Sequence, residues 1–158
     1  MDPQPVVHDT FVLERSYPAS PERVFSYFSD PAKKRRWFGD AASHDVEAFE
    51  LDFRVGGVER NRYRMNDKTP FSGTILANEG TIQEIAPGRR VVTATTMAMG
   101  DHRISSALIT IELTPEGEGT RLVCTHQAAF YEGADGPQMR KGGWEKILDA
   151  LGDAMAPA

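Results

Sequence analysis

The sequence predicts an α+β fold in which a curved antiparallel sheet lies against one long C-terminal helix. Three observations support this prediction. Two helix starts follow one another in SPERVFSYFSDPAKKRRWFG (20–39), the middle of the chain alternates with the period of a strand, and an apolar stripe with helical spacing ends it. The 158 residues are enough for one domain with its own hydrophobic core.

The first strand is expected at 9–17, because the apolar residues Phe11 and Leu13 alternate with their neighbours there. Residues 1–8 are rich in proline and are expected to form a flexible leader. A single domain is therefore expected to span 9–158.

Two short helices should follow this strand. Ser20 precedes Pro21 and Asp30 precedes Pro31, and each pair places a side-chain acceptor before a residue whose φ suits a first helical turn. Gly39 is expected to end the second helix in the left-handed conformation.

From about His44 onward the period changes to two, which is typical of strands. Short connections containing glycine or proline separate the alternating segments and favour an antiparallel meander over parallel crossovers. The six further strands are expected at 46–55, 58–65, 71–85, 90–99, 102–113 and 120–130.

The last segment, 136–155, predicts a helix with one apolar face. The face consists of Trp144, Ile147, Leu148, Leu151 and Met155. Gly142 and Gly143 are unfavourable inside a helix. Either the regular helix starts near Trp144, or the two glycines allow close packing, or they make a pliable helix start that opens a cavity.

Composition and motifs exclude several classes of function. A net charge of -5 argues against a nucleic-acid surface or an anionic membrane as the main partner. Cys124 is the only cysteine, the four histidines lack metal-ligand spacing, and no nucleophile or phosphate-loop motif occurs, so neither a metal nor a cofactor is expected. No apolar run approaches a membrane span and residues 1–10 lack the centre of a signal peptide, so a cytoplasmic protein is expected.

Five segments resemble the motifs of one protein family. They are SPERVFSYFSDPAKKRRWFG, DFRVGGVERNRYRM, GTIQEIAPGRRVV, GTRLVCTHQAAF and GGWEKILDALGDAM. Their order is similar to that of the heat-shock protein 90 ATPase activator homologue family, within the START-like SRPBCC superfamily, and the resemblance covers Thr10 to Met155. It implies a helix-grip fold with a cavity between sheet and helix. Across the superfamily such cavities bind apolar molecules, and in some members they are active sites.

His126 is the most informative ionisable residue. Alternation places it with Leu122, Cys124 and Ala128 on one strand face, expected to be the inner one. It could transfer a proton near neutral pH, line a ligand site or be a hydrogen-bonded core histidine. Glu84 either faces the cavity, where desolvation would raise its pKa, or pairs across the sheet. These two residues are the weak catalytic candidates.

A ligand in the cavity is expected to contact apolar and aromatic side chains and a few polar groups, of which His126, Glu84 and Tyr63 are the candidates. The predicted ligand-binding set is Trp37, Phe38, Phe49, Tyr63, Glu84, Met97, His126, Trp144 and Leu148.

Two charged groups have alternative interpretations. The basic cluster 33–36 is either a solvated helix face or a site for an acidic headgroup or protein partner. Asp52 and Arg54 suggest an ion pair or a backbone contact at the sheet corner, with acid–base chemistry as the alternative.

We therefore expect a small apolar or amphipathic ligand in a cavity between the sheet and the last helix. Two alternatives remain. One is an enzyme of the cyclase, hydratase or hydrolase type using the same cavity. The other is a stress-response module that interacts with a chaperone.

Overall fold

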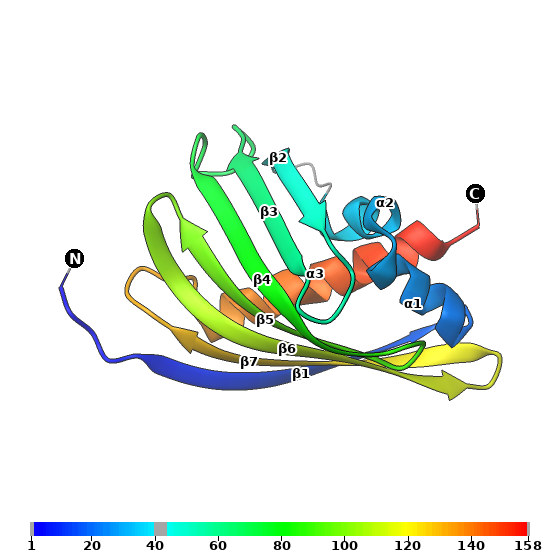
Figure 1. Cartoon of the computed structure of the whole chain (residues 1–158). Coiled ribbons are helices and arrows are strands. Elements are labelled where there is room, and N and C mark those ends of the chain that lie inside the picture. Colours follow the sequence, from blue (N-terminus) through cyan, green and yellow to red (C-terminus); the bar gives the residue numbers. More distant parts are fainter. Residues whose placement is uncertain (1, 40–43, 158) are drawn as a thin grey trace.

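A computed structural model describes residues 2–39 and 44–157. In this part of the chain, a seven-stranded antiparallel sheet curves around one long helix (Figure 1). The strands are β1 (Val7–Tyr17), β2 (His44–Leu51), β3 (Val58–Met65), β4 (Ile75–Ala86), β5 (Arg90–Met99), β6 (His102–Glu116) and β7 (Gly119–Phe130). Their order across the sheet is β1-β7-β6-β5-β4-β3-β2, so β1 joins the C-terminal end of the meander. The fold class expected from the sequence is confirmed.

Both predicted helix starts are present. Helix α1 (Pro21–Ser29) begins after Ser20, whose hydroxyl accepts a hydrogen bond from the Arg23 amide at 3.2 Å. The side chain satisfies an amide that has no partner within the helix, which stabilises the first turn by about 1 kcal/mol.

The second helix has two parts. Asp30 Oδ1 accepts from the Ala32 amide at 2.9 Å and starts α2 (Pro31–Lys34), which continues as the π-helical turn η1 (Arg35–Gly39). The left-handed end predicted at Gly39 is wrong, because its φ is not positive. Gly39 instead allows close packing, since a Cβ there would lie 3.1 Å from the Phe49 ring.

Several strand ends differ from the predicted ones. Strand β1 begins at Val7, so Val7 and His8 pair with β7 although the sequence placed them in the leader. Strand β2 ends at Leu51 because residues 52–57 turn toward β3. Strand β4 begins only at Ile75, because the preceding residues form turns.

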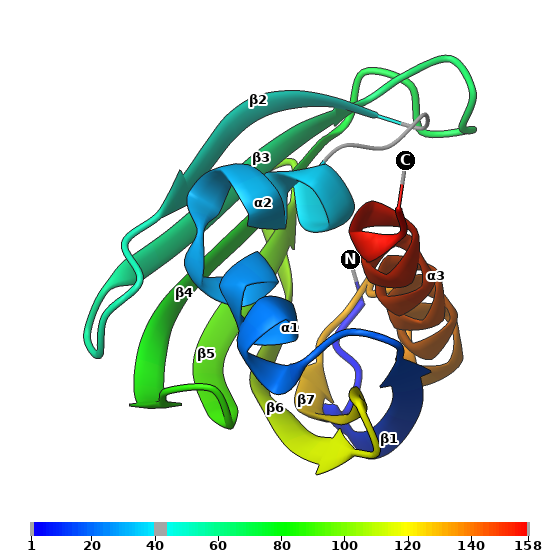
Figure 2. The same cartoon turned by 90° about the vertical axis from the view of Figure 1, so that its right-hand side faces the viewer.

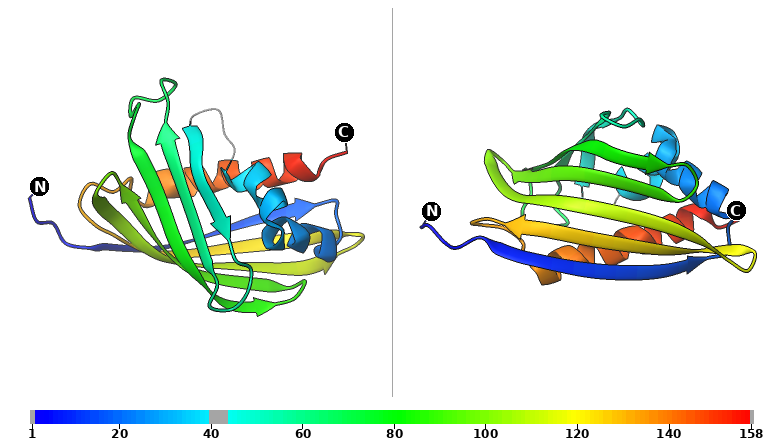
Figure 3. Two further views of the ribbon diagram at one scale, coloured as in Figure 1. Left: turned by 45° about the horizontal axis from the view of Figure 1, so that its top comes forward. Right: turned by 60° about the horizontal axis from the view of Figure 1, so that its bottom comes forward.

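Helix α3 (Pro137–Met155) crosses the concave face of the sheet, with α1 and α2 beside its C-terminal half (Figure 2). Two further views show that the sheet is curved and that its convex face is directed away from the helices (Figure 3). No helix in residues 2–39 or 44–157 is long and apolar enough to cross a membrane.

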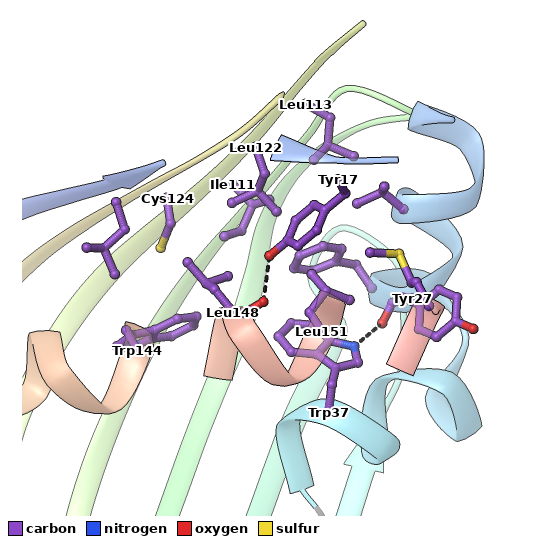
Figure 4. Close-up of a cluster of buried hydrophobic side chains, with 14 of the residues drawn as sticks. Tyr17, Tyr27, Trp37, Ile111, Leu113, Leu122, Cys124, Trp144, Leu148 and Leu151 are labelled. Atoms are coloured by element: carbon purple, nitrogen blue, oxygen red, sulfur yellow. Dashed lines mark hydrogen bonds between the residues drawn. The ribbon is translucent and has the colours of Figure 1, made fainter. Parts of the chain in front are cut away.

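Side chains from the sheet, α1, η1 and α3 form a hydrophobic core beside the C-terminal half of α3 (Figure 4). Leu122 and Leu151 are fully buried there. The Tyr17 hydroxyl donates to the Leu148 carbonyl at 2.7 Å, and Trp37 Nε1 donates to the Tyr27 carbonyl at 2.9 Å. These bonds satisfy the polar ends of large buried rings and tie α3 and η1 to the rest of the fold.

The two glycines of α3 lie inside the regular helix, which begins at Pro137. The expectation that the helix starts near Trp144 is therefore wrong. Close packing is also wrong as an explanation, because a Cβ at Gly142 or Gly143 would meet no atom within 4 Å. The space beside Gly143 belongs to a cavity.

Candidate functional site

A cavity of about 270 Å³ lies between the sheet and α3. Strands β3 to β7 form its floor, and its other walls come from α1, α2, η1, the loop before α3 and α3 itself. Its apolar lining consists of Phe28, Trp37, Phe38, Leu76, Val91, Met97, Met99, Ile104, Ala107, Ile109, Ile111, Met139, Gly143, Trp144 and Ile147.

The cavity is reached from the surface beside the first half of α3. Met139, Gly143 and Ile147 are spaced four residues apart, so they share one helix face, and all three line the cavity. Met139 is 68% exposed and Gly143 is also exposed. The missing side chain at Gly143 therefore leaves space at the rim of the cavity.

Five of the nine residues predicted to bind ligand line this cavity: Trp37, Phe38, Met97, His126 and Trp144. The other four lie elsewhere. Phe49 packs against Gly39, the Tyr63 ring stacks obliquely on His44 at 4.4 Å between centroids, and Leu148 is fully buried in the core.

Glu84 is the fourth predicted residue outside the lining. Its carboxylate accepts two hydrogen bonds from Arg90, at 2.6 and 3.0 Å, and its side chain is 46% exposed. The Arg90 hydrogen bonds hold the pKa of Glu84 below its ordinary value. The cavity-facing alternative with a raised pKa is therefore wrong, and the pairing alternative is confirmed.

Asp52 and Arg54 also lie outside the cavity. Arg54 Nε contacts Asp52 Oδ2 at 2.7 Å, and both side chains are mostly exposed. This is the expected ion pair at the sheet corner.

A buried ion pair forms one polar part of the lining. Lys34 Nζ lies 2.5 Å from Glu59 Oε1, and both side chains are almost completely buried. Lys34 Nζ also lies 4.8 Å from the centre of the Phe38 ring. One interpretation of the sequence expected the whole basic cluster 33–36 to be a solvated helix face. Lys34 does not fit this interpretation, because it is buried against Glu59.

A second ion pair lies at the start of α3. Arg140 is 6% exposed and binds Asp135 through two hydrogen bonds, both of 2.7 Å. Its Nη2 also donates to Ser105 Oγ at 3.0 Å. These contacts neutralise a buried guanidinium and fasten the first turn of α3 to β6.

His126 is 1% exposed, and its ring stacks on Phe11 with 4.5 Å between centroids and 8° between planes. Burial, together with the positive charge of Arg140, lowers the pKa of His126 to about 4. The ring is consequently neutral near pH 7 and a poor proton donor there. Burial likewise raises the pKa of the neighbouring Cys124 thiol to about 12, so it is not a ready nucleophile.

Two buried polar atoms in the described part of the chain have no hydrogen-bond partner: Asn61 Oδ1 and His126 Nδ1. Both residues are 1% exposed and both line the cavity. Most buried polar atoms in native proteins are hydrogen-bonded, because leaving one without a partner costs about 1–3 kcal/mol. The two atoms are thus polar groups buried without a partner in residues beside the cavity.

Of the polar lining, the predicted ligand-binding set contained only His126. It did not contain Lys34, Glu59, Asn61, Asn78, Thr93, Thr95, Ser105, Asp135 and Arg140. A signal existed for two of them. Arg60 and Arg62 alternate with Glu59 and Asn61 along β3, so exposed arginines imply an inward-facing glutamate and asparagine.

Comparisons with known proteins agree with this architecture. The family model described as "Activator of Hsp90 ATPase homolog 1-like protein" matches residues 18–156. A protein from Rhizobium loti is 40% identical, covering 96% of this chain and 100% of its own, with a TM-score of 0.85. A protein from Rhizobium leguminosarum is 35% identical over 95% of both chains, with a TM-score of 0.88. One from Chromobacterium violaceum is 27% identical, covering 94% of this chain and 98% of its own, with a TM-score of 0.77. No functionally curated protein matches the chain.

Proposed function

This chain belongs to the family of Activator of Hsp90 ATPase homolog 1-like proteins, and we propose that it binds a small apolar or amphipathic molecule between its sheet and α3. The cavity of about 270 Å³ carries this proposal. Its walls are mainly apolar with a few polar groups, which is the usual composition of a small-molecule site.

The binding mechanism follows from the lining. Apolar ligand surface that enters the cavity leaves water, which contributes roughly 25 cal/mol for each Å² buried. Met97, Met99 and Met139 offer flexible, polarizable surface that adapts to irregular ligand shapes. The polar groups of the lining orient the ligand and contribute less to its affinity.

Binding is favoured over an enzymatic role of the cyclase, hydratase or hydrolase type. His126 is neutral near pH 7 because its pKa is lowered to about 4, so it supplies no proton to a substrate under these conditions. Glu84, the other catalytic candidate, is bound to Arg90 outside the lining. Among the described lining residues, no activated nucleophile is paired with a base.

A chaperone-interacting role has less support than ligand binding. It depended on the basic cluster 33–36 as an exposed surface, and Lys34 from this cluster is buried against Glu59. The cavity, by contrast, does not depend on a partner protein.

Native mass spectrometry of the purified protein tests the proposal, with two variants that differ only in position. Gly143→Leu places a side chain at the rim of the cavity, whereas Gly142→Leu does so next to it, at a residue outside the lining. Leucine is more favourable than glycine in a helix by roughly 1 kcal/mol, so neither variant should unfold.

We expect a stoichiometric small-molecule adduct on the wild type and on Gly142→Leu, released by denaturation, and no adduct on Gly143→Leu. An adduct retained equally by Gly143→Leu would place the ligand outside the cavity. A wild-type protein without any adduct would count against a tightly held cellular ligand.

A further inference from the structure

Polar residues of the cavity lining gather in one part of its floor. Asn61 on β3 pairs with Asn78 on β4, and Glu59 on β3 pairs with Gly80 on β4. Gly80 in turn pairs with Thr95 on β5. The members of this group that line the cavity form one continuous polar block on the concave face of β3 to β5: Glu59, Asn61, Asn78 and Thr95.

The other end of the cavity is apolar. Along the floor, Asn78 pairs with Met97 and Met97 with Ser105, so Ile109 lies two strands and four residues away from Asn78. This separation is roughly 10 Å across the strands and 13 Å along them. Ile109 pairs with His126, whose ring lies 6.2 Å from that of Trp144 on α3. Side chains of the apolar end are Trp37, Ile109, Ile111, Trp144 and Ile147.

Only two residues of the polar block are accessible to a ligand. Asn61 is 1% exposed, and Glu59 is buried and bound by Lys34. Asn78 and Thr95, by contrast, are only half-buried, and both line the cavity. Since Thr95 pairs with the residue two positions beyond Asn78, the two are diagonal neighbours about 7–8 Å apart, and one small ligand group can contact both.

The hydrogen-bonding groups of these two residues are available. The Asn78 side chain makes no hydrogen bond to any residue that the structure describes, so its amide can both donate and accept. The Thr95 hydroxyl donates to the Glu79 carbonyl at 3.2 Å, and its oxygen can still accept. A ligand group that both donates and accepts hydrogen bonds, such as a hydroxyl or an amide, is complementary to this pair.

The charges beside the polar block do not favour an ionic group. Lys34 and Glu59 neutralise each other, and Arg140 and Asp135 do so at the start of α3. An ionised ligand group would lose its hydration without gaining an uncompensated opposite charge among the described lining residues.

We propose that the ligand is an uncharged amphiphile whose hydroxyl or amide head binds Asn78 and Thr95, and whose apolar chain extends toward Trp144. This inference rests on the proposed function, since it assumes that the cavity binds a ligand. It assigns the class of the head group, the residues that recognise it and the orientation of the ligand.

Tryptophan fluorescence tests the orientation. The chain has two tryptophans, Trp37 and Trp144, and both line the cavity at its apolar end. The probes are decan-1-ol with bromine either on the last carbon or on the carbon next to the one that carries the hydroxyl. Bromine quenches indole fluorescence only at short range. With binding measured by isothermal titration calorimetry and fluorescence compared at saturation, we expect strong quenching by the chain-end bromide and weak quenching by the other.

Three unbrominated probes that share one chain test the head group by calorimetry. They are decan-1-ol, decyl methyl ether and decanoate. The ether loses only the O–H donor, and its added methyl group by itself favours binding in an apolar cavity. We expect the alcohol to bind about fivefold more tightly than the ether, and decanoate to bind more weakly than the alcohol.

A pair of variants on one strand locates the head group. Asn78→Leu keeps the side-chain branching and removes the amide, and since this amide has no partner among the described residues, the fold should tolerate the change. It should weaken decan-1-ol binding about fivefold and leave the ether unaffected. Gln83→Leu is the matched control, because it removes an exposed amide from β4 outside the lining, and it should change neither affinity.

The outcomes separate this inference from the proposed function. Stronger or equal quenching by the bromide beside the hydroxyl overturns the orientation and leaves cavity binding intact. Equal affinity for the alcohol and the ether overturns the assigned head group, and tighter binding of decanoate overturns its neutrality. If no probe binds, both proposals fail for this class of ligand. The wild-type comparisons need no variant, so they hold even if Asn78→Leu does not fold.

Discussion

The neutral state of His126 predicts a specific loss of stability in mild acid. The pKa of His126 is lowered to about 4 in the folded protein, whereas its ordinary value is 6.5. Between these values the unfolded chain binds the proton and the folded protein does not, so stability falls as the pH decreases from about 6.5 toward 4. A difference of about 2.5 pKa units corresponds to about 3 kcal/mol of unfolding free energy.

The surroundings of His126 explain the direction. The ring is stacked on Phe11 and lies 6.2 Å from Trp144, so few polar groups can stabilise an imidazolium. The positive charge of Arg140 acts in the same direction, and the negative charge of Asp135 opposes it. Desolvation is the largest cause.

Urea unfolding of the wild type and of His126→Phe, followed between about pH 7 and pH 4, measures this effect. Phenylalanine keeps a ring against Phe11 and does not titrate. Carboxylates that also titrate in acid, such as Glu84 and Glu132, are common to both proteins and cancel in the difference. We expect the wild type to lose about 3 kcal/mol more than the variant over this range. Parallel pH profiles would refute the assignment of a buried, neutral histidine.

Two further predictions concern other buried groups. Lys34→Met should destabilise the protein by about 3–5 kcal/mol in urea unfolding, because Glu59 is left as a buried, unpaired carboxylate. Adding Glu59→Leu should recover most of that loss. A double variant as unstable as the single one would contradict this coupling. Cys124 is buried, and burial raises the pKa of its thiol to about 12. Ellman's reagent near pH 8 should therefore not react with the native protein, and it should react fully in guanidinium chloride. Rapid reaction of the native protein would show that the thiol is accessible.

The candidate site was predictable from the sequence to the extent that it depends on strand alternation and large apolar residues. The period of two along β7 places His126 beside Leu122 and Cys124, and all three are buried. Trp37 follows from its position at the end of the second short helix and Trp144 from the apolar stripe of the last helix. Such residues have to leave water wherever the chain folds, so their burial depends little on the identity of their neighbours.

The sequence was misleading where a side chain had a choice of partner. Alternation from the buried Ile82 predicts an inward Glu84, but the pairing register shifts between these two residues, and Arg90 across the β4–β5 turn then binds the Glu84 carboxylate. Gly39 has the residue type of a left-handed helix end, yet its role comes from the approach of the Phe49 ring. Neither contact can be derived from local periodicity.

The order of the elements, their type and the inward face of β7 were determined by the sequence alone, because caps, turns and hydrophobic periods act within a few residues of one another. The tertiary structure decided the polar chemistry of the cavity. Lys34 meets Glu59 across 25 residues and Arg140 meets Ser105 across 35. Whether a buried polar atom finds a partner depends on which distant side chain reaches it, and that distance exists only in the folded chain.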